Sequence, residues 1–221
     1  MLELFDYQER TLAALREGMR QGYRSQMLVA PTGGGKTEMA IALMEAVAMK
    51  GNRCAMILDR RVLCDQTSQR MDRYGIDHGV MMAGHWRFRP YEKIQVCSAQ
   101  TLERRESFPG LKVLIVDEAH QTRKQTVEFI KNNPGVIVVG LSATPLTKGL
   151  GKVYENVIST VTTSDLVDLG RLVPLRVFVC KEIDMTGAKK VAGEWSQDDA
   201  AERGMKITGD TVTITQTPQG D

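Results

Sequence analysis

Residues 30–37 read Ala-Pro-Thr-Gly-Gly-Gly-Lys-Thr, and this stretch decides the fold. An apolar run at 26–30 precedes it and a run of helical character at 38–47 follows it, so the order is strand, glycine-rich loop and helix. Glycine has no Cβ, so the N–H groups of such a loop can close around phosphate oxygens. The helix that follows points its positive end at the same anion. The stretch therefore predicts a phosphate-binding loop for a nucleoside triphosphate.

Individual residues of this loop receive expected roles. Lys36 would reach the β- and γ-phosphates, and the Thr37 hydroxyl would ligate Mg²⁺. The nucleotide-binding residues expected from the loop are Pro31, Thr32, Gly33, Gly34, Gly35, Lys36 and Thr37. The alternative, a glycine-rich loop that merely connects two elements, does not account for the adjoining lysine and threonine.

A second motif lies further along the chain. The apolar run at 112–116 ends in Asp117, and Glu118, Ala119 and His120 follow it. A phosphate-binding loop needs a second carboxylate to hold Mg²⁺, and Asp117 supplies one at a strand end. Glu118 is placed to deprotonate the attacking water, which is the work of a general base. The two acids could instead lie at a helix start, where negative charge is favoured, but that reading does not explain the preceding loop.

A third motif ends another apolar run, at 135–141, with Ser142, Ala143, Thr144 and Pro145. The run predicts a buried strand that delivers two hydroxyl groups at its end. By itself Ser-Ala-Thr is more often a capped turn than a site.

The strands and helices alternate along the chain. Strands are expected at 26–30, 53–58, 78–82, 93–98, 112–117 and 136–141, and the main helices at 6–22, 36–50, 61–74 and 121–132. Strands that are apolar on both faces and separated by amphipathic helices predict an α/β fold with a parallel sheet and helices on both faces. The residues expected just beyond the carboxyl ends of different strands, where open sheets bind ligands, are Lys36, Arg61, Ser98, Asp117 and Ser142.

Together these motifs resemble motifs I, II and III of the superfamily 2 helicases and translocases of the DEAH-box type, especially bacterial and phage DNA-repair helicases. The resemblance covers roughly residues 4–180 and implies a RecA-like P-loop lobe that uses ATP and Mg²⁺ and moves on DNA. It implies that Gln8 contacts adenine and that His120, Ser142 and Thr144 couple hydrolysis to motion. The residues that it places along the nucleic-acid backbone are Arg61, Ser98 and Thr101.

The segment 84–93 interleaves aromatic and basic residues, with Trp86 and Arg87 as its candidates for nucleic-acid contact. Aromatic rings can stack on bases, while arginine and lysine follow phosphates. The alternative is a solvated hairpin tip with one anchoring tryptophan, and the sequence does not decide between them.

Composition and charge bound the remaining possibilities. The chain has 221 residues and a net charge of +2, but residues 182–221 hold eight acids and four bases, so residues 1–181 carry +6. No apolar run is long enough for a bilayer, and the four cysteines form no Cys-x-x-Cys pair. We therefore expect no membrane insertion and no zinc, and a cytoplasmic location in a bacterial or phage-infected cell.

The sequence as a whole predicts a RecA-like ATP-binding lobe over 1–160, an extension or linker over 161–181 and a polar acidic segment over 182–221. No Gln-x-x-Gly-Arg-x-x-Arg element, which would belong to a second helicase lobe, occurs before Asp221. We therefore expect a second lobe in cis or in trans, and little turnover by these 221 residues alone. Two alternatives remain: a truncated or split module that binds nucleotide and DNA without turnover, and the motor portion of a restriction-type complex.

Overall fold

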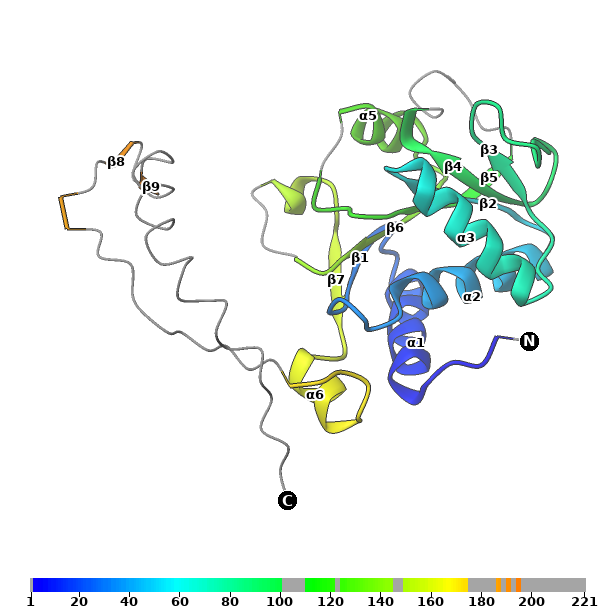
Figure 1. The fold of residues 1–221 in the computed structure, drawn as a ribbon. Helices are drawn as coiled ribbons and strands as arrows, with labels where there is room; N and C mark the ends of the chain where they lie inside the picture. The colour runs from blue at the N-terminus through cyan, green and yellow to red at the C-terminus, as the bar shows by residue number, and fades with distance from the viewer. Residues whose placement is uncertain are drawn as a thin grey trace. The chain divides into compact units, whose positions relative to one another are not determined.

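Seven parallel strands form the sheet that positions the predicted loops (Figure 1). The computed structural model describes residues 2–100, 110–121, 124–144 and 149–174, with short pieces at 186–187, 190–191 and 194–195. The strands are β1 (Ser25–Val29), β2 (Arg53–Leu58), β3 (Gly79–Met81), β4 (Ile94–Ser98), β5 (Leu111–Val116), β6 (Ile137–Ser142) and β7 (Asn156–Ser159). Their order across the sheet is β3-β4-β2-β5-β6-β1-β7.

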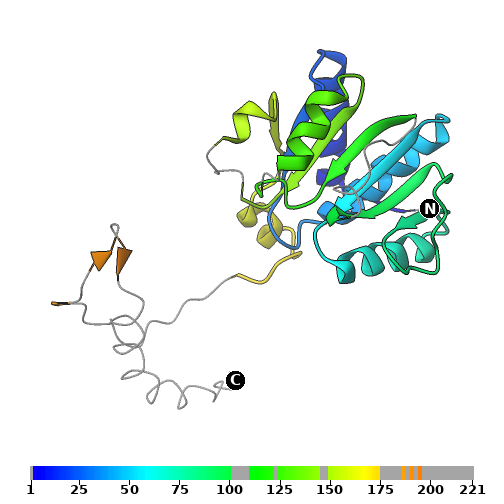
Figure 2. The same ribbon diagram turned by 90° about the horizontal axis from the view of Figure 1, so that it is seen from above.

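Helices cover both faces of this sheet (Figure 2). The helices are α1 (Asp6–Arg20), α2 (Lys36–Met49), α3 (Arg61–Arg73), α5 (Lys124–Asn132), α6 (Thr163–Asp168) and the short 3₁₀ helix η1 (Leu150–Lys152). Helices α1, α2, α3 and α6 contribute to the core on one face, which includes Leu15, Met39 and Leu166. Phe129 of α5 and Tyr154 contribute to the core on the other face. The predicted fold class, a RecA-like parallel sheet with helices on both faces, is confirmed.

Strand β7 was not expected from the sequence. It pairs parallel with β1, Met27 opposite Val157, and forms one edge of the sheet. Only Ile158 of its four residues is buried, while Val157 is 57% exposed. An edge strand of this length lacks the continuous apolar run that identifies the central strands.

The first compact unit extends past the boundary expected at residue 160, as far as Val173. Helix α6 belongs to it because Leu166 is fully buried in the same core as α1 and α2. Thr162 caps this helix, and the Asp165 carboxylate completes the capping box. Helix α1 starts after Phe5, and the side-chain carbonyl of Gln8 accepts the Phe5 N–H at 3.0 Å.

A second unit spans Pro174–Asp221. Its described part is an antiparallel pair, β8 (Lys190–Val191) and β9 (Glu194–Trp195). The sequence also predicts a strand at 175–181, but this segment lies outside the described residues. Among the described helices of the chain, none has the length and apolar character needed to cross a bilayer.

Candidate nucleotide-binding site

The glycine-rich loop joins β1 to α2 at the carboxyl edge of the sheet, as the sequence predicted. Gly35, with φ +74°, ends the loop and stands directly before the first turn of α2. The backbone of the loop is tied to the neighbouring strand, since Ala30 donates its N–H to the Ser142 carbonyl at 3.1 Å. A cleft of about 640 Å³ opens beside the loop. Its lining includes Gln8, Thr32, Gly33, Gly35, Lys36, Thr37 and Glu118.

Lys36 is the cation that the loop itself supplies to this cleft, and its ammonium group is held close to the loop. Its Nζ donates to the carbonyl oxygens of Ala30 at 3.0 Å and of Pro31 at 3.3 Å. Burial lowers the pKa of Lys36, and the charges of Glu118 and Asp117 oppose this shift. An anion that entered the cleft would favour the charged lysine and replace these weak carbonyl acceptors by phosphate oxygens.

Asp117 and Glu118 lie at the carboxyl end of β5, opposite Lys36 in charge. Burial raises the pKa of Asp117, with Glu118 adding to this shift and Lys36 opposing it. A hydroxyl from Thr37 and a carboxylate from Asp117 are the oxygen donors that Mg²⁺ prefers, so these residues fit the predicted metal role. Mg²⁺ there would favour the ionised carboxylate.

Glu118 has a strained backbone. Its φ of 47° is the single positive value among the described residues other than glycine. Such a conformation costs of the order of 1–3 kcal/mol and persists where neighbours fix it. Here the flanking N–H groups fix it, because Asp117 donates to Ile57 at 3.0 Å and Ala119 donates to Leu141 at 2.8 Å. The strain turns the Glu118 side chain out of strand geometry and toward the cleft, whose lining includes it.

A polar chain connects Glu118 to the end of β6. The His120 Nδ1 lies 3.3 Å from the Glu118 carboxylate and 3.2 Å from the Ser142 hydroxyl. The Ser142 Oγ in turn accepts the Thr144 N–H at 3.0 Å. The three residues for which we predicted coupling thus form a chain of contacts that starts at the predicted base: Glu118 contacts His120, His120 contacts Ser142, and Ser142 contacts Thr144.

Comparison with known proteins assigns a family to this arrangement. Residues 1–147 match the family described as type III restriction enzyme, res subunit. The chain belongs to this family. It carries the RecA-like lobe of a superfamily 2 helicase, as the motifs predicted. A 51.5 kDa protein of a Lactococcus phage (isolate 7-9) is 25% identical over 197 residues, covering 84% of this chain and 40% of that protein.

Solved structures share the fold of this res-subunit family lobe. The UvsW helicase from bacteriophage T4 superposes with a TM-score of 0.60 at 18% identity, covering 71% of this chain and 60% of that one. A nuclease-deletion mutant of the type ISP restriction-modification enzyme LlaGI, solved with a DNA substrate mimic, gives 0.62 at 16% identity. It covers 98% of this chain and 23% of that one. The chain therefore spans less than two thirds of the length of each of these relatives.

Gln8, expected to contact adenine, lies at the edge of the cleft in the res-family lobe. It is 3% exposed, and its amide nitrogen approaches the Gly34 carbonyl at 3.5 Å. The Tyr7 hydroxyl donates to the same carbonyl at 3.3 Å. Both side chains of α1 therefore brace the phosphate-binding loop from outside, and adenine contact by Gln8 stays a prediction.

Three residues near the loop were missed by the sequence analysis: Phe5, Arg171 and Leu172. The Arg171 guanidinium lies 3.8 Å from the centroid of the Phe5 ring. Leu172 packs directly against Gly33, where an added Cβ would come within 2.7 Å of the leucine Cδ2. These contacts join the loop to the end of the first unit. No local pattern signals them, because they depend on how α6 packs against α1.

The glycine at position 35 provides a test of the loop geometry. We expect Gly35→Ala to weaken ATP binding strongly, since an added Cβ would lie 2.1 Å from the Gln8 amide nitrogen and φ is +74°. Gly51→Ala is the matched control. Gly51 lies just past the other end of α2, has a φ of +79°, and has nothing within 4 Å of an added Cβ. Both variants carry the left-handed strain of about 1–2 kcal/mol. Equal ATP affinities in the two variants, measured by calorimetry, would contradict a loop shaped by Gly35.

The predicted nucleic-acid contacts have a mixed outcome. Arg61 begins α3 and is exposed, and it donates to the Ala83 carbonyl at 2.9 Å. Trp86 is 76% exposed, which fits a contact residue. Ser98 is buried at 3% exposure, which does not fit a contact with a nucleic-acid backbone. Thr101 lies outside the described residues.

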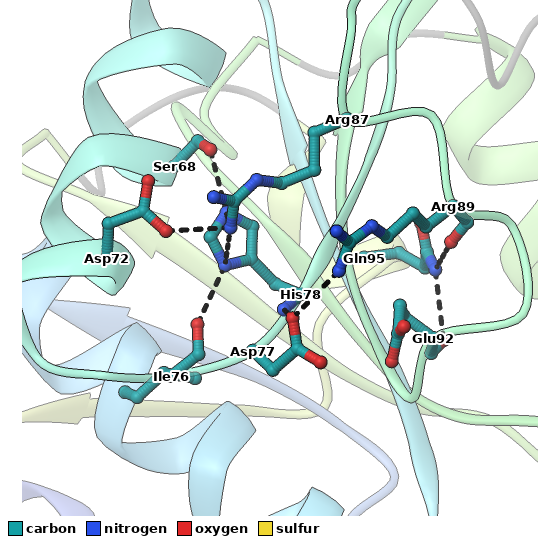
Figure 3. A network of polar contacts seen from close by, with 9 residues as sticks. All are labelled: Ser68, Asp72, Ile76, Asp77, His78, Arg87, Arg89, Glu92 and Gln95. Atoms are coloured by element: carbon teal, nitrogen blue, oxygen red, sulfur yellow. Dashed lines mark hydrogen bonds and ion pairs between the residues drawn. The ribbon is translucent and has the colours of Figure 1, made fainter.

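Arg87 does not fit its predicted role either. Its side chain is 12% exposed and forms an ion pair of 2.7 Å with Asp72 (Figure 3). A guanidinium that is largely covered and already paired with a carboxylate is less accessible to a phosphate. Partly buried and exposed positions alternate in this segment, and Arg87 follows the exposed Trp86, so its contact with nucleic acid stays a prediction.

Proposed function

We propose that this chain is the ATP-hydrolysing lobe of a motor that moves on DNA. The observation that carries the proposal is the chain of contacts from Glu118 through His120 to Ser142 and Thr144. It links the candidate base beside the γ-phosphate position to the end of the next strand. A change in the contacts of Glu118 when the nucleotide is hydrolysed would therefore alter the position of residues at the end of β6, outside the cleft.

In the proposed reaction, Lys36 and the loop N–H groups hold the triphosphate, and Thr37 and Asp117 hold Mg²⁺. Glu118 accepts a proton from the water that attacks the γ-phosphorus, and ADP and phosphate leave. Mg²⁺ neutralises charge on the β- and γ-oxygens when it is bound. We place this activity in the cytoplasm, where both ATP and DNA are present.

The proposal includes a second lobe, in cis or in trans. An arginine from such a lobe would stabilise the transferring phosphoryl group, an effect worth roughly 10³–10⁵ in turnover. The 221 residues are then expected to hydrolyse ATP near background, whereas a protein with both lobes reaches about 1 s⁻¹ or more when DNA is added. Phosphate release measured with and without DNA tests this. Turnover in a two-lobed protein that DNA does not change would overturn the assignment to a DNA motor.

A second candidate is the motor subunit of a restriction complex. The family match and the fold shared with a restriction-modification enzyme favour it. This candidate predicts cleavage of DNA when nuclease and methyltransferase subunits are supplied, whereas a free helicase separates strands without them.

A further inference from the structure

The loop between β3 and β4, residues 82–93, combines a fixed backbone with exposed aromatic side chains. His85 and Arg87 turn inward, while Trp86 between them is 76% exposed. Tyr91, near the other end of the loop, is 92% exposed. A large ring that stays in water on an ordered segment is a candidate for ligand contact, and Trp86, which lies between two inward-turned side chains, is the stronger candidate of the two.

Arg87 anchors the loop to helix α3 through Asp72 (Figure 3). Its Nη1 lies 2.7 Å from the Asp72 carboxylate and 3.3 Å from each of the two ring nitrogens of His78. Equal distances to both nitrogens place the guanidinium over the face of the imidazole rather than in a hydrogen bond with its edge. The cation is therefore held between a carboxylate and a ring.

His78 is fixed in turn by two hydrogen bonds. Its Nδ1 donates to the Ile76 carbonyl at 2.8 Å, and its Nε2 accepts from the Ser68 hydroxyl at 2.7 Å. Both ring nitrogens are used, so the imidazole cannot rotate without losing a hydrogen bond. Burial lowers the pKa of His78, in agreement with a neutral ring.

One face of α3 supplies most of these anchors. Arg61, Asp65, Ser68 and Asp72 are spaced four, three and four residues apart, which places them on one side of the helix. Arg61 donates to Ala83, and Asp65 lies 3.3 Å from the His85 Nε2. The loop is thus fastened along the helix that starts at the carboxyl end of β2.

The far half of the loop is held by buried side chains of the sheet. The Gln95 amide donates to the carbonyls of Arg89 at 2.8 Å and Glu92 at 2.9 Å, and Arg53 donates to Pro90 at 2.6 Å. The network leaves the Nε of Arg87 and the Oε1 of Gln95 buried without a partner. Buried polar atoms without a partner lower stability. The hydrogen bonds that hold the loop therefore come with an energetic cost.

We infer that loop 82–93 is a preformed stacking platform for single-stranded DNA. Trp86 stacks on an unpaired base, and Arg61, which is hydrogen-bonded to Ala83 of the same loop, contacts a phosphate. Asp72 and Arg87 are positioning residues that act through the loop. This inference rests on the proposed DNA motor and deepens it by naming unpaired nucleotides as the ligand.

The surroundings of Trp86 favour nucleic acid over a protein partner. With 76% of its surface exposed, Trp86 stays largely open to solvent, although the Arg87 guanidinium lies 4.8 Å and the His85 ring 5.7 Å from its ring centroid. An exposed ring on a loop that also holds an exposed arginine, Arg61 through Ala83, suits a base followed by a phosphate. The platform also adjoins the start of α3, at the edge of the sheet that carries the phosphate-binding loop.

Tryptophan fluorescence gives a direct test. The chain has two tryptophans, so Trp195→Phe leaves Trp86 as the single reporter. Titration with a dT₂₀ oligonucleotide should quench its emission, and the corresponding duplex should not. In anisotropy with labelled dT₂₀, Trp86→Ala should weaken affinity roughly 5- to 150-fold without changing the salt dependence. Arg61→Ala should weaken affinity and flatten that dependence.

Tyr91→Ala is the matched control, because it removes a more exposed aromatic residue from the other end of the same loop. It should leave dT₂₀ affinity nearly unchanged. Trp86→Ala affinity equal to that of the parent, or DNA binding without quenching, would overturn the platform and point to a protein partner for this surface.

The positioning role of Asp72 has its own readout. Asp72→Asn should keep ATP affinity but reduce the amplitude of Trp86 quenching at saturating dT₂₀, since Arg87 loses its charged partner. Unchanged quenching would remove Asp72 from the platform. Should this variant fail to fold, the exposed Trp86→Ala exchange still decides the question.

DNA-stimulated ATP hydrolysis, measured in a two-lobed protein, separates the two proposals. If Trp86→Ala leaves both DNA affinity and the stimulation unchanged, only the platform is contradicted and the DNA motor stands.

Discussion

A Glu118→Gln variant is expected to bind Mg–ATP as the parent does and to hydrolyse it about 10²- to 10⁴-fold more slowly in a two-lobed protein. Glutamine has the same shape and can keep the contact with His120, which lies 3.3 Å from the Glu118 carboxylate. It cannot accept the proton of the attacking water. Phosphate release and ATP affinity, measured on the same preparation, check the two halves of this expectation.

Two other acids, Glu38 and Asp117, serve as controls. Glu38 lines the same cleft but pairs with Arg70 at 2.5 Å, so Glu38→Gln should leave turnover within a few fold of the parent. Asp117→Asn should lose Mg²⁺-dependent ATP binding, because Asp117 is assigned to the metal. Loss of binding in Glu118→Gln together with normal binding in Asp117→Asn would mean that the two roles are exchanged.

The sequence predicted the centre of the sheet well for a physical reason. Strands β1, β2, β4, β5 and β6 are buried along nearly their whole length, so each reads as a largely apolar run. Parallel strands point their carboxyl ends to one edge, so motifs that follow different strands had to meet there. That Ser142, His120 and Glu118 are in contact follows from β5 and β6 being neighbours, which order alone did not show.

The remainder depends on contacts between distant segments. Leu172 against Gly33 and Arg171 on Phe5 require the packing of α6, which has no counterpart in any local pattern. Arg87 was assigned to nucleic-acid contact because aromatic and basic residues are interleaved in the predicted loop. Its partner, Asp72, lies on α3, and only the fold shows that this face of the helix is turned to the loop.

The strained backbone at Glu118 also lay beyond sequence reasoning. A glutamate gives no sign of a φ of 47°, since it normally avoids this region. The conformation exists because β2 and β6 hold both neighbouring N–H groups. Strain at a residue that we had already assigned as the base supports a functional origin for it.

Lys36→Ala is expected to remove most of the ATP affinity without unfolding the lobe. Charge-assisted hydrogen bonds are worth about 1.5–3 kcal/mol each, so losing one or two weakens binding on the order of 10²-fold. The fold does not need this cation, because burial lowers the pKa of Lys36. A lowered pKa means that the unfolded chain binds the proton more tightly than the folded lobe does. The charged lysine therefore reduces stability at pH values below its folded pKa, and alanine removes that penalty.

Thermal unfolding with and without Mg–ATP separates these two effects. At ATP 100-fold above its Kd, the parent gains about 2.7 kcal/mol, which raises the Tm by several degrees. At the same ATP concentration a variant with 100-fold weaker binding gains only about 0.4 kcal/mol. Lys36→Ala should therefore melt at or above the parent temperature in the absence of ATP, and ATP should raise its Tm little. Lys36→Arg keeps the charge but presents a planar guanidinium in place of the compact ammonium that the Ala30 and Pro31 carbonyls hold, so it should recover only part of the ATP-induced rise. A full ATP-induced rise in Lys36→Ala would show that the triphosphate is bound elsewhere than in this loop.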